Sequence, residues 1–320
     1  MPEQPLLLTA GPPPPSPART RPPQREPLRL GLVQERWHPD PDEHLEALAR
    51  GIRIAAGEGA RIVCLQELTL SPYFATTPDG PRAAGAAPEE LETGPTVTFA
   101  RGVAAETGVH VHASLYERAD DEDGLGYNTA VVVAPDGRLQ SRTRKLHIPV
   151  TAGYYEDRYF RPGPAGREGG GPFPITALPT ADGEARLGCP TCWDQWFPEL
   201  ARAYSLEGAE VLIYPTAIGS EPDHPEFDTQ PLWQQVIVAN GVANGTFMVA
   251  VNRIGFEDPL TFYGSSFISD PYGRVLVKAP RDQPAVLVAD LDLDQRRDWL
   301  ELFPFLSTRR PDAYGLLTRQ

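Results

Sequence analysis

Three residues in this sequence have the types that hydrolysis by a thiol requires: Glu67, Lys145 and Cys192. Such chemistry needs a nucleophile at a tight turn, a base that takes its proton, and a cation or backbone N–H groups that stabilise the oxyanion. Cys192 lies between the predicted strand 185–190 and a predicted helix, so its sulfur can project at a helix N-terminus, where thiolates are stabilised. Glu67 follows the apolar run 62–65, and Lys145 lies near the end of a predicted hairpin. Each also has an ordinary explanation: a buried cysteine, a solvated carboxylate or a surface lysine.

A cluster of these three residue types can share one proton near neutral pH. A free thiol has a pKa of about 8.5, which a neighbouring carboxylate raises and a lysine or a helix N-terminus lowers. The titration would then belong to the cluster rather than to one residue.

The cysteine spacing supports a second hypothesis. Cys189 and Cys192 have the C-x-x-C spacing of a thioredoxin-type redox motif, so a disulfide oxidoreductase is an alternative. A milder version is that oxidation joins the two thiols and silences hydrolysis. The pair lacks a second Cys or His pair at zinc-binding spacing, so no metal is expected, and no other cofactor is needed. The sequence contains no G-x-S-x-G elbow, H-E-x-x-H helix or phosphate-binding loop.

The segments that carry these residues alternate between strand and helix patterns. Gly- and Pro-rich turns at 135–137 and 270–273 indicate two hairpins, and residues 149–184 are expected to form a long loop with few regular elements. The two halves of the chain share this order of elements, which predicts a layered α/β fold. The predicted strands are 28–34, 61–66, 109–116, 128–134, 138–146, 185–190, 211–215, 246–251 and 285–291, and the predicted helices are 42–57, 95–108, 198–208 and 231–244.

Three segments resemble motifs of the nitrilase, or carbon-nitrogen hydrolase, superfamily. Residues 65–74 resemble its glutamate motif, residues 144–149 its lysine motif and residues 192–199 its nucleophile motif. The order Glu, Lys, Cys also matches, and the resemblance extends from about residue 28 to residue 314. It implies a four-layer α-β-β-α sandwich formed by a hydrolase domain over residues 29–320. It also implies pairing of protomers into a homodimer or larger homo-oligomer.

The resemblance assigns roles to the candidate residues. Glu67 would be the general base that deprotonates Cys192, and Lys145 with the backbone N–H of Trp193 would stabilise the oxyanion. Glu156 resembles a second glutamate that orients the substrate or Lys145.

Two further residues are expected substrate contacts. Tyr73 lies within the segment that resembles the glutamate motif. Glu221, after the predicted strand 211–215, could contact the cationic end of a diamine. It could equally belong, with Asp223, to a solvated loop. A carbamoyl amino acid would instead need a basic contact such as Arg253.

Within the superfamily, residues 192–199 and 209–222 resemble those of N-carbamoylputrescine amidases. The implied reaction cleaves a small N-carbamoyl substrate through a thioester and releases ammonia, carbon dioxide and the free amine. Asn240 resembles β-ureidopropionase-type members instead. A simple aliphatic amidase or a nitrilase is a further alternative.

Composition limits the partners. The chain has 320 residues, 41% of them apolar, with 29 Lys and Arg against 43 Asp and Glu. No basic run suggests a nucleic-acid partner, and the apolar runs are too short for a membrane helix. The three cysteines are not a disulfide framework, so a cytoplasmic location is expected.

The first 28 residues contain ten prolines. This composition predicts a disordered extension, with a Pro-rich docking segment as the alternative. A non-catalytic member that binds a partner through this arm is a third hypothesis.

Overall fold

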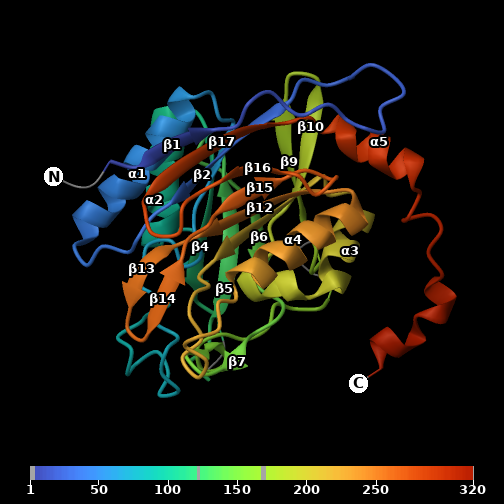
Figure 1. The fold of residues 1–320 in the computed structure, drawn as a ribbon. Helices are drawn as coiled ribbons and strands as arrows, with labels where there is room; N and C mark the ends of the chain where they lie inside the picture. The colour runs from blue at the N-terminus through green and yellow to red at the C-terminus, as the bar shows by residue number, and fades with distance from the viewer. Residues whose placement is uncertain (1–3, 121–122, 167–170, 320) are drawn as a thin grey trace.

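The computed structural model describes residues 4–120, 123–166 and 171–319, which contain two large β-sheets that lie face to face (Figure 1). The first sheet consists, in spatial order, of β1 (Leu6–Thr9), β17 (Ala285–Leu291), β2 (Leu28–Gln34), β3 (Ile62–Cys64), β4 (His110–Glu117), β5 (Tyr127–Val133) and β6 (Leu139–Arg144). The second consists of β16 (Val275–Lys278), β15 (Phe267–Ser269), β12 (Phe247–Asn252), β11 (Val211–Thr216), β10 (Gly183–Gly188) and β9 (Ile175–Thr180).

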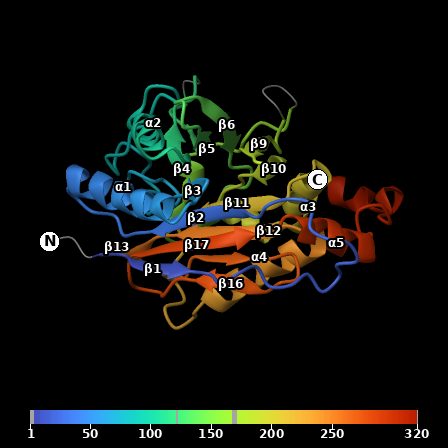
Figure 2. The ribbon, with the colours of Figure 1, turned by 90° about the horizontal axis from the view of Figure 1, so that it is seen from above.

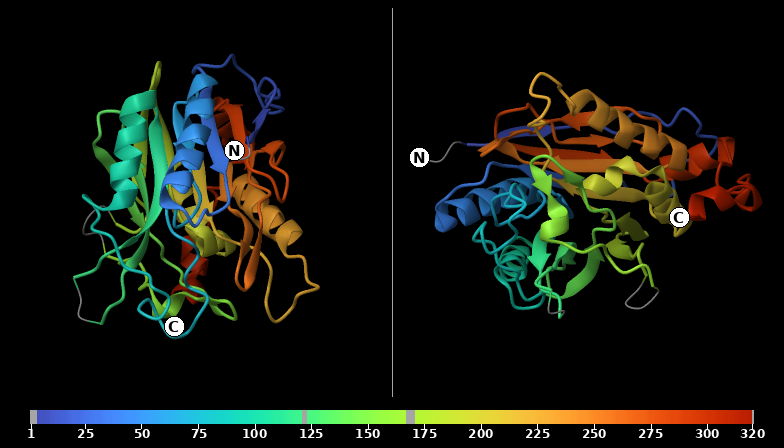
Figure 3. Two further views of the ribbon diagram at one scale, coloured as in Figure 1. Left: turned by 90° about the vertical axis from the view of Figure 1, so that its left-hand side faces the viewer. Right: turned by 90° about the horizontal axis from the view of Figure 1, so that it is seen from below.

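Helices cover the outer faces of both sheets, as Figures 2 and 3 show. Helices α1 (Pro41–Gly57) and α2 (Pro95–Thr107) pack on the first sheet, and α3 (Pro198–Leu206) and α4 (Gln230–Asn244) pack on the second. This arrangement confirms the predicted four-layer α-β-β-α sandwich. None of the described helices has both the length and the apolar character that a membrane span requires.

The approach of α1 to the first sheet depends on a glycine. Asp40 begins α1 by accepting the backbone N–H groups of Asp42 and Glu43 at 2.9 and 3.0 Å. A Cβ atom at Gly51 would lie 2.6 Å from Val33 Cγ1, so only glycine lets the helix pack this closely on β2.

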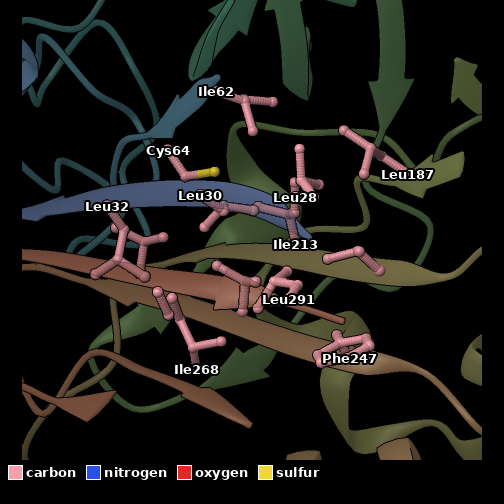
Figure 4. Packing of buried hydrophobic residues seen from close by; sticks show 14 of the residues in the cluster. Leu28, Leu30, Leu32, Ile62, Cys64, Leu187, Ile213, Phe247, Ile268 and Leu291 are labelled. Atoms are coloured by element: carbon pink, nitrogen blue, oxygen red, sulfur yellow. The ribbon is translucent and has the colours of Figure 1, made fainter. Parts of the chain in front are cut away.

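The main core lies between the two sheets (Figure 4). Along β2, Leu30 and Leu32 point into this inter-sheet core, whereas Val33 points outward to α1. The opposite sheet contributes Ile213 and Phe247, and all these side chains are buried. The alternation follows from the two-residue period of a strand, and burying each large apolar side chain contributes about 1.5–3 kcal/mol.

Most predicted elements are present, with shifted ends, but the sequence missed several short ones. β9 lies inside the predicted loop 149–184, where it pairs antiparallel with β10. The other missed elements are β7 (Val150–Thr151), β8 (Tyr154–Tyr155), η1 (Glu156–Arg158), η3 (Cys192–Trp196), β13 (Ile254–Glu257), β14 (Leu260–Tyr263), α5 (Asp294–Leu302), η4 (Pro311–Ala313) and η5 (Gly315–Thr318).

The predicted disorder of residues 1–28 was wrong for the part that the structure describes, while residues 1–3 lie outside it. β1 pairs in parallel with β17, and the arm then reaches α5 (Figure 1). Arg19 donates to Asp292 at 2.7 Å and to Asp298 at 2.8 Å. The composition of the arm could not reveal this, because β17 and the carboxylates that hold the arm come from the other end of the chain.

Candidate active site

Glu67 lies in the turn after β3, and its side chain is completely buried. Its Oε1 accepts hydrogen bonds from Asn128 Nδ2 at 2.7 Å and from Lys145 Nζ at 3.0 Å. Its Oε2 is buried and has no hydrogen-bond partner in the described part of the chain, so it is available to accept a proton. The next residue, Leu68, has φ 50°, a left-handed conformation that turns the chain sharply here.

Lys145 follows β6, and its side chain is also completely buried. Besides Glu67, its Nζ contacts Oε1 and Oε2 of Glu156 at 2.9 and 2.7 Å. Burial alone would lower the pKa of Lys145, but the charges of Glu156 and Glu67 raise this pKa above its ordinary value. Lys145 is therefore a fixed cation between two carboxylates.

Glu156 begins the short helix η1 and is held by two partners. In addition to Lys145, Tyr73 donates its hydroxyl to Glu156 Oε1 at 2.9 Å. Burial raises the pKa of Glu156 to about 7, although Lys145 acts in the opposite direction. Because a buried carboxylate needs donors, Tyr73 and Lys145 together keep Glu156 in place.

Cys192 is the first residue of η3 and has a left-handed φ of 39°. Its thiol is almost completely buried. Burial raises the pKa of Cys192, and the charge of Glu67 raises it further, whereas Lys145 lowers it. These influences together favour the protonated thiol, and the three predicted residues lie close enough to interact electrostatically.

Asp194 connects the cysteine turn to the segment after Lys145. Its carboxylate accepts the backbone N–H of Thr191 at 3.2 Å and that of His147 at 3.0 Å, and it contacts His147 Nδ1 at 2.7 Å. Since Asp194 is buried, these bonds tie the segment of Cys192 to the segment that follows Lys145.

A cavity of about 200 Å³ opens in front of Cys192. Of the predicted residues, Glu156, Trp193 and Glu221 line it with Cys192. Tyr73 does not line it and is hydrogen-bonded to Glu156 instead. Burial raises the pKa of the half-buried Glu221. No group of three potential metal ligands occurs among the residues described.

Sequence reasoning missed several residues of this site. Asn128 holds Glu67, and Tyr154 and Thr229 line the cavity. Asn128 is the second residue of the strongly apolar strand β5, so its position was a usable signal. Tyr154 lies in the two-residue strand β8 and Thr229 lies directly before α4, and neither position gave a signal.

Two alternatives from the sequence involve residues that lie outside the cavity. Cys189 is buried in the inter-sheet core with Cys64, whereas Cys192 lines the cavity, and all three are free thiols. Arg253 is completely buried against the turn after Glu67 and does not line the cavity, so it cannot contact a substrate carboxylate there.

Comparisons with known proteins agree with the geometry. The model of the carbon-nitrogen hydrolase family matches residues 29–301. An N-carbamoylputrescine amidase of Arabidopsis thaliana is 37% identical over 302 residues, which cover 92% of this chain and 96% of that protein. A citrullinase of Francisella tularensis subsp. tularensis is 35% identical over 300 residues, which cover 92% of this chain and 99% of that protein.

Solved structures share the fold. A carbon-nitrogen hydrolase from Helicobacter pylori G27 matches with a TM-score of 0.76 and 32% identity, covering 92% of this chain and 99% of that one. An amidase from Nesterenkonia sp. matches with a TM-score of 0.67 and 22% identity, covering 92% and 97% of the two chains.

Proposed function

The chain belongs to the carbon-nitrogen hydrolase family, and we propose that it hydrolyses an N-carbamoyl amine whose far end is positively charged, with N-carbamoylputrescine as the best fit. The supporting observation is that Glu221 lines the same cavity as Cys192, while none of the described lining residues is Lys or Arg. An ammonium group at the far end of the substrate would thus meet a carboxylate and no opposing cation. The N-carbamoylputrescine amidase of Arabidopsis thaliana supports the same assignment.

In the first half of the proposed reaction, Glu67 takes the proton of the Cys192 thiol. The thiolate forms a C–S bond with the ureido carbonyl, and the charge that develops on its oxygen is stabilised by Lys145 and the backbone N–H of Trp193. The terminal C–N bond then breaks, and the nitrogen leaves as ammonia with the proton that Glu67 held.

In the second half, Glu67 takes a proton from water, and the hydroxide adds to the carbamoyl thioester. The C–S bond breaks, Cys192 regains its proton, and the carbamate product loses carbon dioxide to give the free amine. No step requires a metal or an organic cofactor.

Citrulline is the second candidate, because a citrullinase is 35% identical to this chain. Citrulline has the same terminal ureido group, but its far end carries a carboxylate as well as an ammonium group. Such a carboxylate would lie in a cavity whose described lining supplies two carboxylates, Glu156 and Glu221, and no basic side chain. Like-charge contacts of this kind are unfavourable, so the cavity favours the diamine.

Ammonia release from matched compounds tests this proposal. The panel contains N-carbamoylputrescine, citrulline, β-ureidopropionate, N-carbamoylbutylamine, a simple amide and a nitrile, with Cys192→Ala as the inactive control. Preference for N-carbamoylputrescine over the uncharged butylamine analogue is the expected result. Preference for citrulline, or for β-ureidopropionate, would reject the diamine assignment while keeping the reaction class.

We further propose that the protein is a cytoplasmic homo-oligomer. The free thiols are compatible with a reducing compartment. Apolar side chains on α3, on α4 and in the C-terminal segment are exposed: Leu206, Leu232, Leu316 and Leu317. An exposed apolar surface of this kind is typical of subunit contacts. Analytical ultracentrifugation would show the assembly, and a monomer at micromolar concentration would reject it.

A further inference from the structure

Arg253, directly after β12, is completely buried, yet it faces no substrate cavity. Its guanidinium donates to the backbone carbonyl of Glu67 at 2.7 Å and to those of Leu68 and Ser71 at 3.2 Å each. One side chain thus binds three carbonyls of the turn that carries the proposed base. All three bonds come from Nη2, which leaves Nη1 for a second partner, whereas a lysine has a single nitrogen and cannot serve two sets of acceptors on opposite sides.

The charge of Arg253 is balanced by Glu257, at the end of β13. Arg253 contacts both carboxylate oxygens of Glu257 at 2.7 and 2.9 Å. Glu257 in turn accepts the backbone N–H of Tyr73 at 2.6 Å. The ion pair is therefore hydrogen-bonded to the backbone at both ends of the segment 67–73.

Both ends of this segment reach the reacting groups. At one end, Glu67 contacts Lys145. At the other end, Tyr73 donates to Glu156, which also contacts Lys145. Between the two ends, Leu68 has a left-handed φ of 50°, a conformation that an L-residue adopts only where its surroundings impose it.

We propose that the Arg253–Glu257 ion pair is a positioning unit that fixes the Glu67 carboxylate and the Tyr73 hydroxyl against Lys145. Arg253 acts through the backbone of the turn and touches no substrate. The inference rests on the proposed roles of Glu67 and Cys192, and it adds two residues on which the proton transfer depends.

Arg253→Lys is the main test, and the chain offers a matched control. Arg296 also donates to three backbone carbonyls, those of Ser205, Asn244 and Gly245, at 2.8–3.0 Å, but it does so at the ends of α3 and α4. Arg296→Lys therefore removes the same kind of backbone contact away from the site.

Three quantities are measured for both variants: the melting temperature, kcat and KM, and the pH dependence of Cys192 alkylation by iodoacetamide. Alkylation needs no substrate, so it reports the coupling of base and thiol even if the carbamoyl substrate has been wrongly assigned. The titratable groups around Glu67 are Lys145, Glu156, Tyr73 and Cys192, and those around Arg253 are Glu257 and His44.

We expect Arg253→Lys to lower kcat about 10- to 100-fold, because a small misplacement of a catalytic group has effects of this size. KM should change less than about threefold, and the alkylation profile should move along the pH axis. Arg296→Lys should lower the melting temperature but leave kcat and the alkylation profile unchanged.

Glu257→Gln provides the test if Arg253→Lys does not fold. The Gln oxygen can still accept the Tyr73 N–H, while the negative charge is removed, so a kcat loss of about 3- to 10-fold is expected. Equal kcat and alkylation profiles in Arg253→Lys, Glu257→Gln and Arg296→Lys would overturn the proposal. If Cys192→Ala were alkylated as fast as the wild type, the assignment of the nucleophile would fail instead.

Discussion

The substrate preference depends most directly on Glu221, so replacing Glu221 by Gln is the sharpest perturbation of the proposed function. The substitution keeps size and hydrogen bonding but removes the charge that would face the substrate ammonium group. Two unit charges about 4 Å apart interact by about 4 kcal/mol at the effective dielectric of a protein surface. Glu221 is only half-buried, so water screens the pair, and we expect a loss of about 1–3 kcal/mol.

This loss corresponds to a decrease of about 5- to 150-fold in kcat/KM for N-carbamoylputrescine. For the uncharged N-carbamoylbutylamine, kcat/KM should stay within about twofold of the wild-type value. Glu226→Gln is the control, because Glu226 is exposed on the same loop and does not line the cavity. Ammonia release gives kcat/KM for the wild type, Glu221→Gln and Glu226→Gln with both substrates. Equal effects of the two substitutions, or equal losses for both substrates, would refute a direct contact between Glu221 and the ammonium group.

Three further predictions concern stability and oxidation. Burial raises the pKa of the Glu156 carboxyl from an ordinary 4.5 to about 7, so the folded protein binds this proton more tightly than the unfolded chain does. The free energy of unfolding of the wild type, relative to that of Glu156→Gln, should therefore fall as the pH rises from 4.5 to about 7. Urea unfolding at a series of pH values measures this difference. Deleting residues 1–27 removes β1 and the ion pairs of Arg19, so the melting temperature should fall by at least about 3 °C, and an unchanged value would contradict the role of the arm. Cys189→Ala should hydrolyse the substrate as the wild type does and should lose activity to the same extent under mild oxidant, because Cys189 lies in the core. If the activity of the variant resisted the oxidant, a disulfide between Cys189 and Cys192 would be supported instead.

Regular local patterns determined most of the fold. The alternation in β2 and the helical spacing in α1 are properties of short segments, and so they were predicted near their observed ends. The motif segments around Glu67, Lys145 and Cys192 could also be identified, because each combines a distinctive set of residues at fixed spacing.

Contacts between distant segments were decided only by the tertiary structure. Arg253 lies 186 positions from Glu67, and nothing near it in the sequence shows that it binds the Glu67 turn rather than a substrate. In the same way, the arm is held by β17 and Asp298, which lie about 280 residues later in the chain. The proline content of the arm carries no information on these distant partners, and by itself it predicted disorder. The sequence by itself determines local conformation and the types of chemical groups, whereas burial and charge pairing depend on which remote segments the fold brings together.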